Sequence, residues 1–302
     1  ASTSSGDFDV TVLYYAYSDT YISSVRTALD ADLTAAGITY TDYDSNNSQT
    51  TQNEYIDTAI ANGTDLLIVN MVTSGSSDTA NSICDKAEAA GIPVIFLNRA
   101  VEEDDNAGAV LGTRSNIAFV GTDAPEAGHM QGEMIGNYLI ENYDAVDLNG
   151  DGEISYAMFM GDASNVEAIY RTQYSVEDAN AILTENGKPE LSYFDATNEN
   201  KYQLDMTGAW SAQAAMEYMQ TNLASYSEAN GNMIELIICN NDNMAEGCIT
   251  ALQAAGYNNG EGTTTIPVFG VDATDSAKAL IAAGTMTGTV EQSATGMADA
   301  LL

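Results

Sequence analysis

The sequence has few basic residues and no long apolar run. Eight lysines and arginines stand against 44 aspartates and glutamates in 302 residues, which gives a formal net charge of -36. Such a charge repels nucleic acid and anionic membrane surfaces, so neither is an expected partner. No apolar stretch reaches the roughly 20 residues that a membrane-spanning helix needs. The polar start, residues 1–7, is typical of a linker that remains after an export signal is removed, which predicts an extracytoplasmic protein.

Cysteine and histidine are also scarce. The three cysteines, Cys84, Cys239 and Cys248, occur in apolar surroundings and lack the spacing of a disulfide framework or a zinc site, so we expect buried thiols that pack as small apolar groups. The single histidine, His129, has no carboxylate or serine partner suggested by any motif. A structural or surface role is therefore favoured over a role as catalytic base.

Strand-like and helical segments alternate along the chain. Its 302 residues allow one large or two medium domains, and a hydrophobic content of 45% is enough to build their cores. One series has strands at 10–15, 38–43, 66–70, 94–98 and 118–122 with helices such as 21–36 and 78–90. A second has strands at 156–161, 191–195, 236–240, 268–271 and 286–290 with helices at 166–186, 212–223, 243–255 and 276–283. The pattern predicts an α/β fold of two doubly wound parallel-sheet lobes joined by a hinge. Gly121 and Pro125 mark the crossing, where Asp123 is expected to cap the next helix.

The most specific motif is an acidic loop at 147–155, which places oxygen-bearing residues at alternate positions around a glycine, as a calcium loop does. An EF-hand would continue with a glutamate at the twelfth position and a second helix, but Met158 stands there and 154–160 alternates like a strand. We therefore expect a helix-loop-strand Ca²⁺ site that is closed by a carboxylate from a remote segment. An accidental acidic turn is the alternative. The expected ligands within the loop are Asp147, Asn149, Asp151, Glu153 through its carbonyl, and Ser155.

Polar side chains follow the strands in both series, at the sheet edge where α/β proteins bind ligands. Planar amides, carboxylates and a guanidinium can grip adjacent hydroxyls, and the rings of Tyr21 and Trp210 can cover apolar C–H faces, so the set suits a sugar. The alternative is that Asn and Asp follow strands as turn and cap residues. Arg171 is one of only four arginines, and the alternative to a role in sugar binding is a structural ion pair. The set contains Asp19, Tyr21, Asn98, Asn165, Glu167, Arg171, Asn240, Asn241, Asp242, Asp272 and Gln292.

From about Phe8 to Ala298 the chain resembles the galactose/glucose-binding proteins, the extracytoplasmic sugar receptors of bacterial ABC transporters. The resemblance rests on the loop at 147–155 and on the segments 93–98, 118–123, 240–245 and 266–273. It implies the type I fold of periplasmic binding proteins, with a first lobe of residues 1–122 and 293–302 and a second of 123–292. The lobes would close on one pyranose sugar. It also implies that Glu235 completes the calcium site.

The same resemblance implies ten sugar contacts: Asp19, Tyr21, Asn98, Asn165, Glu167, Arg171, Trp210, Asn241, Asp272 and Gln292. Tyr202 is the alternative to Trp210. The family has phenylalanine in place of Tyr21, histidine and aspartate in place of Asn165 and Glu167, and asparagine in place of Gln292. Because a buried polar group left unpaired costs ~1–3 kcal/mol, these changes alter which sugar fits.

We therefore expect a non-enzymatic, monomeric receptor that delivers a galactose- or glucose-like hexose to an ABC transporter permease, with a chemoreceptor or sensor as a further partner. It would lie in the periplasm, or be a lipoprotein on the outer face of a Gram-positive membrane. A receptor for another sugar, or a sugar-sensing accessory protein, is the alternative. A glycoside hydrolase could use two of Asp19, Glu167 and Asp272, but nothing in the sequence marks two of these carboxyl groups as an acid and a nucleophile. A sugar-responsive repressor would need a helix-turn-helix and a basic face. The family continues with another strand, so the native chain is expected to extend past Leu302.

Overall fold

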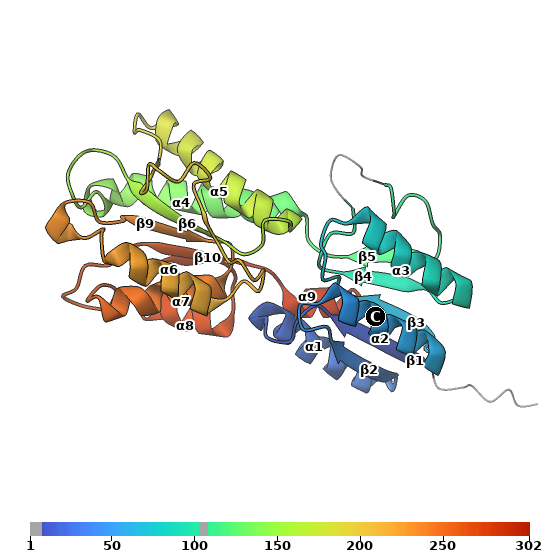
Figure 1. The fold of residues 1–302 in the computed structure, drawn as a ribbon. Coiled ribbons are helices and arrows are strands. Elements are labelled where there is room, and N and C mark those ends of the chain that lie inside the picture. The colour runs from blue at the N-terminus through green and yellow to red at the C-terminus, as the bar shows by residue number, and fades with distance from the viewer. Residues whose placement is uncertain (1–7, 103–107) are drawn as a thin grey trace, which may run out of the picture. The chain divides into compact units, whose positions relative to one another are not determined.

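The computed structural model describes residues 8–102 and 108–302, so the predicted linker at 1–7 lies outside the described residues. The chain divides into two compact units, each built on a parallel sheet (Figure 1). The first contains the described residues up to Thr122, with Ser164–Val166 and Ser293–Leu302; the second contains Asp123–Ala163 and Glu167–Gln292. The predicted class, two α/β lobes with parallel sheets, is confirmed. No helix of the described ranges is long and apolar enough to cross a bilayer.

The first unit has a sheet of strand order β2-β1-β3-β4-β5 between two helical layers. Residues of β1 alternate between the layers: Val12 and Tyr14 pack with α1 and α9, and Leu13 packs with α2 and α3. The strands are β1 (Asp9–Tyr14), β2 (Thr39–Asp44), β3 (Leu66–Val69), β4 (Val94–Leu97) and β5 (Ile117–Val120). The helices are α1 (Thr20–Ala36), α2 (Gln49–Asn62), α3 (Ser77–Ala90) and α9 (Ala294–Asp299).

The second unit repeats the plan with strand order β11-β10-β9-β6-β7, and β8 pairs with β6 beside this path. Ile135 and Leu139 of α4 pack on one face of the sheet, and Met219 of α6 and Leu252 of α7 pack on the other. The strands are β6 (Ser155–Met160), β7 (Ser192–Tyr193), β8 (Gln203–Leu204), β9 (Leu236–Cys239), β10 (Val268–Asp272) and β11 (Gly288–Glu291). The helices are α4 (Ala124–Val146), α5 (Val166–Glu185), α6 (Ala212–Leu223), α7 (Asp242–Ala254) and α8 (Asp275–Ala282), with a short 3₁₀ turn, η2 (Glu228–Asn230).

Several predicted elements differ from the structure. The strand expected at 191–195 pairs only at Ser192 and Tyr193, because Asp195 then accepts the N–H of Thr197 and turns the chain. No bounds were predicted for helix α2, because its buried face is only Gln52, Ile56 and Ala59, too little for a clear apolar period.

One prediction about a single side chain is wrong, and two are confirmed. Asp123 stands at the N-cap of α4 without a side-chain cap bond, and the helix begins at Ala124 with Pro125 in its first turn. The predicted structural or surface role of His129 is confirmed: its Nδ1 lies 2.7 Å from Asp178 Oδ2, a partner that no motif indicated, and its ring stacks on Tyr174. It remains about half exposed on the surface. All three cysteines are buried and free, as expected.

A carboxyl pair joins α1 to β2 in the first unit. Burial, and after it a hydrogen bond with Asp30, raises the pKa of Asp42 to about 7, while Arg26 acts in the opposite direction. The folded state therefore keeps a proton that an unfolded aspartate, with a pKa of about 3.9, has already released. The stability from this proton is complete below pH ~4 and is lost as the pH rises through ~7.

We therefore predict that Asp42→Asn reduces the loss of stability between pH 5 and pH 8. The reduction should be about 1 kcal/mol rather than the full value of the shift, because solvent screens this partly exposed carboxyl. Urea unfolding at both pH values measures it, with Asp32→Asn in α1, the helix of Asp30, as the control. Equal losses in wild type and Asp42→Asn would refute the prediction.

Candidate functional site

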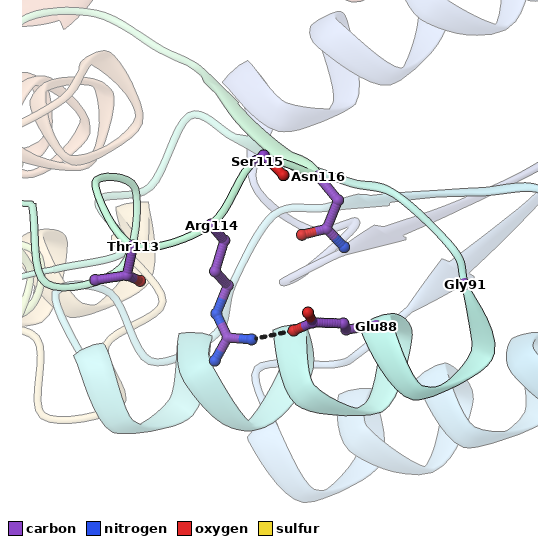
Figure 2. Close-up of a pocket in the computed structure, with 6 residues that line it drawn as sticks. All are labelled: Glu88, Gly91, Thr113, Arg114, Ser115 and Asn116. Atoms are coloured by element: carbon purple, nitrogen blue, oxygen red, sulfur yellow. Dashed lines mark hydrogen bonds and ion pairs between the residues drawn. The ribbon is translucent and has the colours of Figure 1, made fainter.

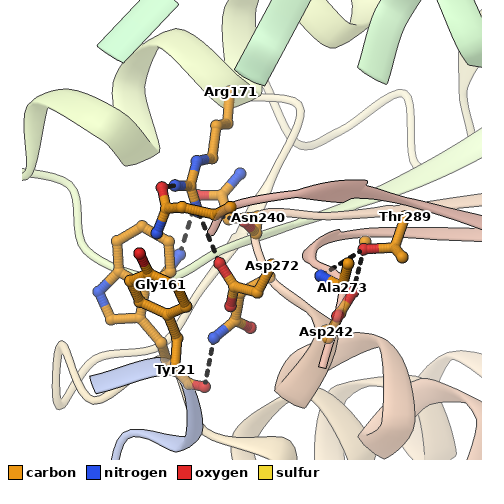
Figure 3. A network of polar contacts seen from close by, with 12 residues as sticks. Tyr21, Gly161, Arg171, Asn240, Asp242, Asp272, Ala273 and Thr289 are labelled. Carbon is orange, nitrogen blue, oxygen red and sulfur yellow. Dashed lines mark hydrogen bonds and ion pairs between the residues drawn. The ribbon is translucent and has the colours of Figure 1, made fainter. Parts of the chain in front are cut away.

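Arg171 of α5 lies at the centre of a buried polar network in the second unit (Figure 3). Its side chain is 5% exposed. One terminal nitrogen donates to the carbonyl of Asn240 at 2.9 Å and lies 3.9 Å from Asp272 Oδ1; the other donates to Gln292 Oε1 at 3.0 Å. Its Nε atom is buried and has no hydrogen-bond partner among the described residues. The guanidinium is therefore fixed from several sides and still has a donor to offer.

Trp210 packs beside this arginine, with the guanidinium carbon 5.6 Å from its ring. Its backbone is left-handed, with φ of 54°, and its ring lies against Gly161, where any added Cβ would strike the ring. The amides of Asn241 and Asn243 donate to the Trp210 carbonyl at 3.5 and 3.1 Å and hold this bend. The indole nitrogen is buried and lacks an acceptor in the described chain. Tyr202, the alternative aromatic residue, packs in the same small cluster.

The residues after β9 connect the network to α7. Asn241 is the N-cap of this helix, and its Oδ1 accepts the N–H of Met244 at 2.9 Å. Asn240 accepts the N–H of Gly161 at 3.1 Å and donates to Thr172 at 3.0 Å. The predicted capping role is thus real for Asn241, and its amide nitrogen donates in addition to the carbonyl of Trp210. Asn165, Glu167 and Gln292 are also buried, at 2%, 6% and 7% exposure.

Asp272 ends β10 in an unusual conformation. Its φ is 123° and that of the next residue, Ala273, is 55°, although neither is a glycine. The Asp272 carboxylate faces Arg171 within the network (Figure 3). Beneath this turn lies Asp242, fully buried, whose pKa is raised by burial to about 6 although Thr289 and Thr274 donate hydrogen bonds to it.

In the first unit, Asp19 caps α1 by accepting the N–H of Ile22 at 2.7 Å, and its second oxygen accepts the hydroxyl of Tyr15 at 2.6 Å. Asn98 follows β4 with φ of 63° and is 9% exposed. Tyr21 is buried, and its hydroxyl lies 3.7 Å from the sulfur of Met297. The predicted capping role applies to Asp19, which stands directly before α1 in the segment that follows β1.

Arg99 is a candidate that the sequence reasoning missed. It is 3% exposed, its guanidinium lies 3.5 Å from the ring centre of Tyr15, and it donates to the carbonyl of Val72 at 2.7 Å. Like Arg171, it is a buried arginine in a chain with few basic residues. Its position directly after Asn98, at the end of a strand, was the available signal.

The acidic loop at 147–155 joins α4 to β6, so the predicted helix-loop-strand arrangement is confirmed. Asp147 accepts the N–H groups of Gly150 and Gly152 at 2.8 and 2.9 Å. Asn149 and Asp151 each accept the N–H two residues further on, at 2.8 and 2.9 Å. Both glycines are left-handed, with φ of 72° and 86°. These hydrogen bonds between side-chain oxygens and backbone N–H groups hold the loop in a compact turn.

Glu235, the remote carboxylate, does lie against this loop. One oxygen accepts the N–H of Leu148 at 2.8 Å and the other accepts the N–H of Ser155 at 2.9 Å and its hydroxyl at 3.2 Å. Burial raises its pKa although these bonds oppose the shift. Among residues 8–102 and 108–302, no three Asp, Glu, His or Cys side chains are grouped closely enough to hold a metal ion. The donor chemistry fits a hard cation, and calcium binding stays a prediction.

A surface pocket of about 450 Å³ lies elsewhere in the first unit, beside the end of α3 (Figure 2). Arg114, one of its lining residues, is paired with Glu88 at 2.7 Å and with Asp85 at 2.6 Å. Its charge is therefore already balanced by two exposed carboxylates. None of the predicted site residues lines this pocket.

Comparison with known proteins agrees with this architecture. The family model described as periplasmic binding protein domain matches residues 10–302. The chain is 33% identical over 285 residues to the D-galactose/methyl-galactoside binding periplasmic protein MglB of Haemophilus influenzae. The aligned region covers 94% of this chain and 76% of that protein.

Solved structures are similar in fold. An ABC transporter solute binding protein from Bacillus halodurans with bound myo-inositol has a TM-score of 0.71 at 25% identity, covering 99% of this chain and 88% of that one. The Caulobacter myo-inositol binding protein has a TM-score of 0.73 at 22% identity, covering 98% and 86%. These relatives are binding proteins rather than enzymes. With two parallel-sheet lobes and a family match along nearly its whole length, the chain belongs to the periplasmic binding protein family.

Proposed function

We propose that this protein is an extracytoplasmic receptor that binds a monosaccharide of the galactose and glucose class and delivers it to an ABC transporter permease. The observation that carries the proposal is the fixed, buried Arg171 with Trp210 beside it. Sugars present adjacent hydroxyls and apolar C–H faces, which a guanidinium fork and an aromatic ring recognise. The match to a galactoside-binding relative supports this ligand class.

Two buried N–H groups strengthen the case. The Arg171 Nε and Trp210 Nε1 atoms have no acceptor among the described residues. A buried donor without a partner costs ~1–3 kcal/mol, so each favours a ligand that carries acceptor oxygens. Asp272, Asn241 and Gln292 can accept or donate bonds to neighbouring hydroxyls of the same ligand. In the first unit, Asp19, Asn98 and Tyr21 are the proposed contacts, with Arg99 as an addition.

We further propose that the changes from the family pattern at Tyr21, Asn165, Glu167 and Gln292 tune the choice of sugar. Each alters side-chain reach or hydrogen-bonding capacity at a buried position. Myo-inositol belongs in the test because two relatives in the same fold carry it. A chemoreceptor partner and a lipid anchor remain proposals that follow from the family resemblance.

The test is a thermal-shift panel of D-galactose, D-glucose, D-xylose and myo-inositol. Ligand at one hundred times its dissociation constant should stabilise the fold by about 2.7 kcal/mol, which raises the melting temperature measurably. We expect the largest shift with D-galactose or D-glucose. A shift with myo-inositol or D-xylose alone would correct the ligand class, and a flat response to all four would refute the proposed function.

We also propose one structural Ca²⁺ in the second unit, held by Asp147, Asn149, Asp151, the carbonyl of Glu153 and Glu235, with Ser155 at its edge. Calcium would supply the positive charge that this cluster of acidic oxygens lacks. The Ser155 hydroxyl lies within hydrogen-bond distance of Glu235, at 3.2 Å, and of the carbonyl of Met233, at 3.0 Å, and can donate its one proton to either. It therefore orients the glutamate whether or not it also meets the ion.

A further inference from the structure

The turn after β10 is held in a conformation that its residues do not favour. Asp272 and Ala273 both have positive φ, at 123° and 55°. A side chain in such a region costs on the order of 1–3 kcal/mol and persists only where the surroundings enforce it. The turn also carries the carboxylate that faces Arg171. The groups that enforce the turn therefore also determine where this carboxylate points.

Two side chains, Thr289 and Asp242, accept hydrogen bonds from the backbone of this turn. Thr289 of β11 accepts the N–H of Ala273 at 3.2 Å and donates its own proton to Asp242 Oδ1 at 2.6 Å. The second oxygen of Asp242 accepts the N–H of Thr274 at 2.9 Å. Successive N–H groups of the turn are thus fixed by one hydroxyl and one carboxylate, which lie together in Figure 3.

The packing around Asp242 leaves space for its carboxylate. It is fully buried at the start of α7, directly after Asn241. Gly270 of β10 gives it room, because a Cβ on that residue would collide with the Asp242 carboxylate. A buried carboxylate is costly unless its oxygens are hydrogen-bonded, and the bonds that Asp242 receives from side chains and from other elements come from the turn and from Thr289.

We infer that Asp242 and Thr289 are positioning residues for ligand binding: they hold the strained turn at 272–274 so that Asp272 presents its carboxylate beside Arg171. The inference rests on the proposed function, since it assumes that Asp272 contacts the ligand. Neither positioning residue needs to touch the ligand itself. Loss of the hydrogen bonds from the turn to Asp242 and Thr289 would let Asp272 relax to an extended conformation and carry its carboxylate away from Arg171.

The chain offers a matched pair of variants on one strand edge. Thr287, just before β11, accepts the N–H of Val268 at 3.0 Å at the opposite end of β10. Thr287→Val and Thr289→Val each remove one hydroxyl that accepts one N–H of this strand or its turn. Thr289→Val also takes a donor from the buried carboxylate of Asp242, so we expect it to lower stability more than Thr287→Val, and only Thr289→Val disturbs the turn at Asp272. Thr289→Ser keeps the hydroxyl and serves as the rescue variant.

The experiment is calorimetric titration of the wild type and the three variants with D-glucose and D-galactose, with melting temperatures measured without sugar. We expect Thr289→Val to weaken binding about tenfold, and Thr287→Val and Thr289→Ser to change it less than about threefold, as loss of one hydrogen bond near the ligand predicts. Equal affinity in Thr289→Val and wild type, or equal losses in the two valine variants, would overturn the inference. Wild type that binds neither sugar would instead count against the proposed ligand.

Discussion

Arg171→Ala is expected to weaken sugar binding by at least about a hundredfold, the largest effect of any single substitution in the site. Removing one partner of a buried, charge-assisted hydrogen-bond network costs ~2–5 kcal/mol. Arg171 meets that description, because its side chain is 5% exposed and its terminal nitrogens are fixed by Asn240 and Gln292. Calorimetry with D-glucose and D-galactose measures the effect.

Two further variants show what the arginine contributes. Arg171→Lys retains the positive charge but loses the planar fork, so its affinity should also fall, by about tenfold or more. Arg114→Ala removes an arginine whose partners, Asp85 and Glu88, are exposed surface carboxylates, and it should leave affinity unchanged. If Arg171→Ala binds as tightly as Arg114→Ala, the assignment of Arg171 to the ligand site fails.

The sequence predicted the fold well because its strongest signals are local. Buried strands such as β9 and β10 are continuous apolar runs, and their ends differ from the predicted ends by one residue at most. The signal was weaker where burial is slight or the paired segment is short. Helix α2 buries a glutamine, an isoleucine and an alanine on its inner face, and β8 pairs over only two residues.

The candidate site was harder to predict, because its chemistry depends on contacts between distant segments. The polar residues after the strands could be named, yet nothing local shows that Asp242 and Thr289 meet 47 residues apart. The left-handed backbones of Trp210 and Asp272 were equally hidden, since neither residue type marks positive φ as glycine does. Arg99 was missed because nothing local shows that its guanidinium lies over the ring of Tyr15, which is distant in the sequence.

Calcium is expected to stabilise the second unit, and Glu235→Gln is expected to abolish that effect. At one hundred times its dissociation constant, an ion that binds only the folded state adds about 2.7 kcal/mol. Glu235 reaches Leu148 and Ser155, at both ends of the acidic loop, and it is 1% exposed. A glutamine at this position keeps the shape but loses the charge and one acceptor oxygen, so the loop should lose its affinity for a hard cation.

The measurement is the rise in melting temperature when calcium is added to chelator-treated protein, because this difference separates ion binding from any direct effect of the substitution on folding. Wild type and Glu228→Gln, which changes an exposed glutamate in η2, should show the same rise. Glu235→Gln should show less than about a third of it, since the remaining carboxylates, Asp147 and Asp151, bind the ion weakly on their own. Wild type whose melting temperature is the same with chelator and with calcium would show that the loop is a hydrogen-bonded acidic turn, held by its own backbone N–H groups and by Glu235.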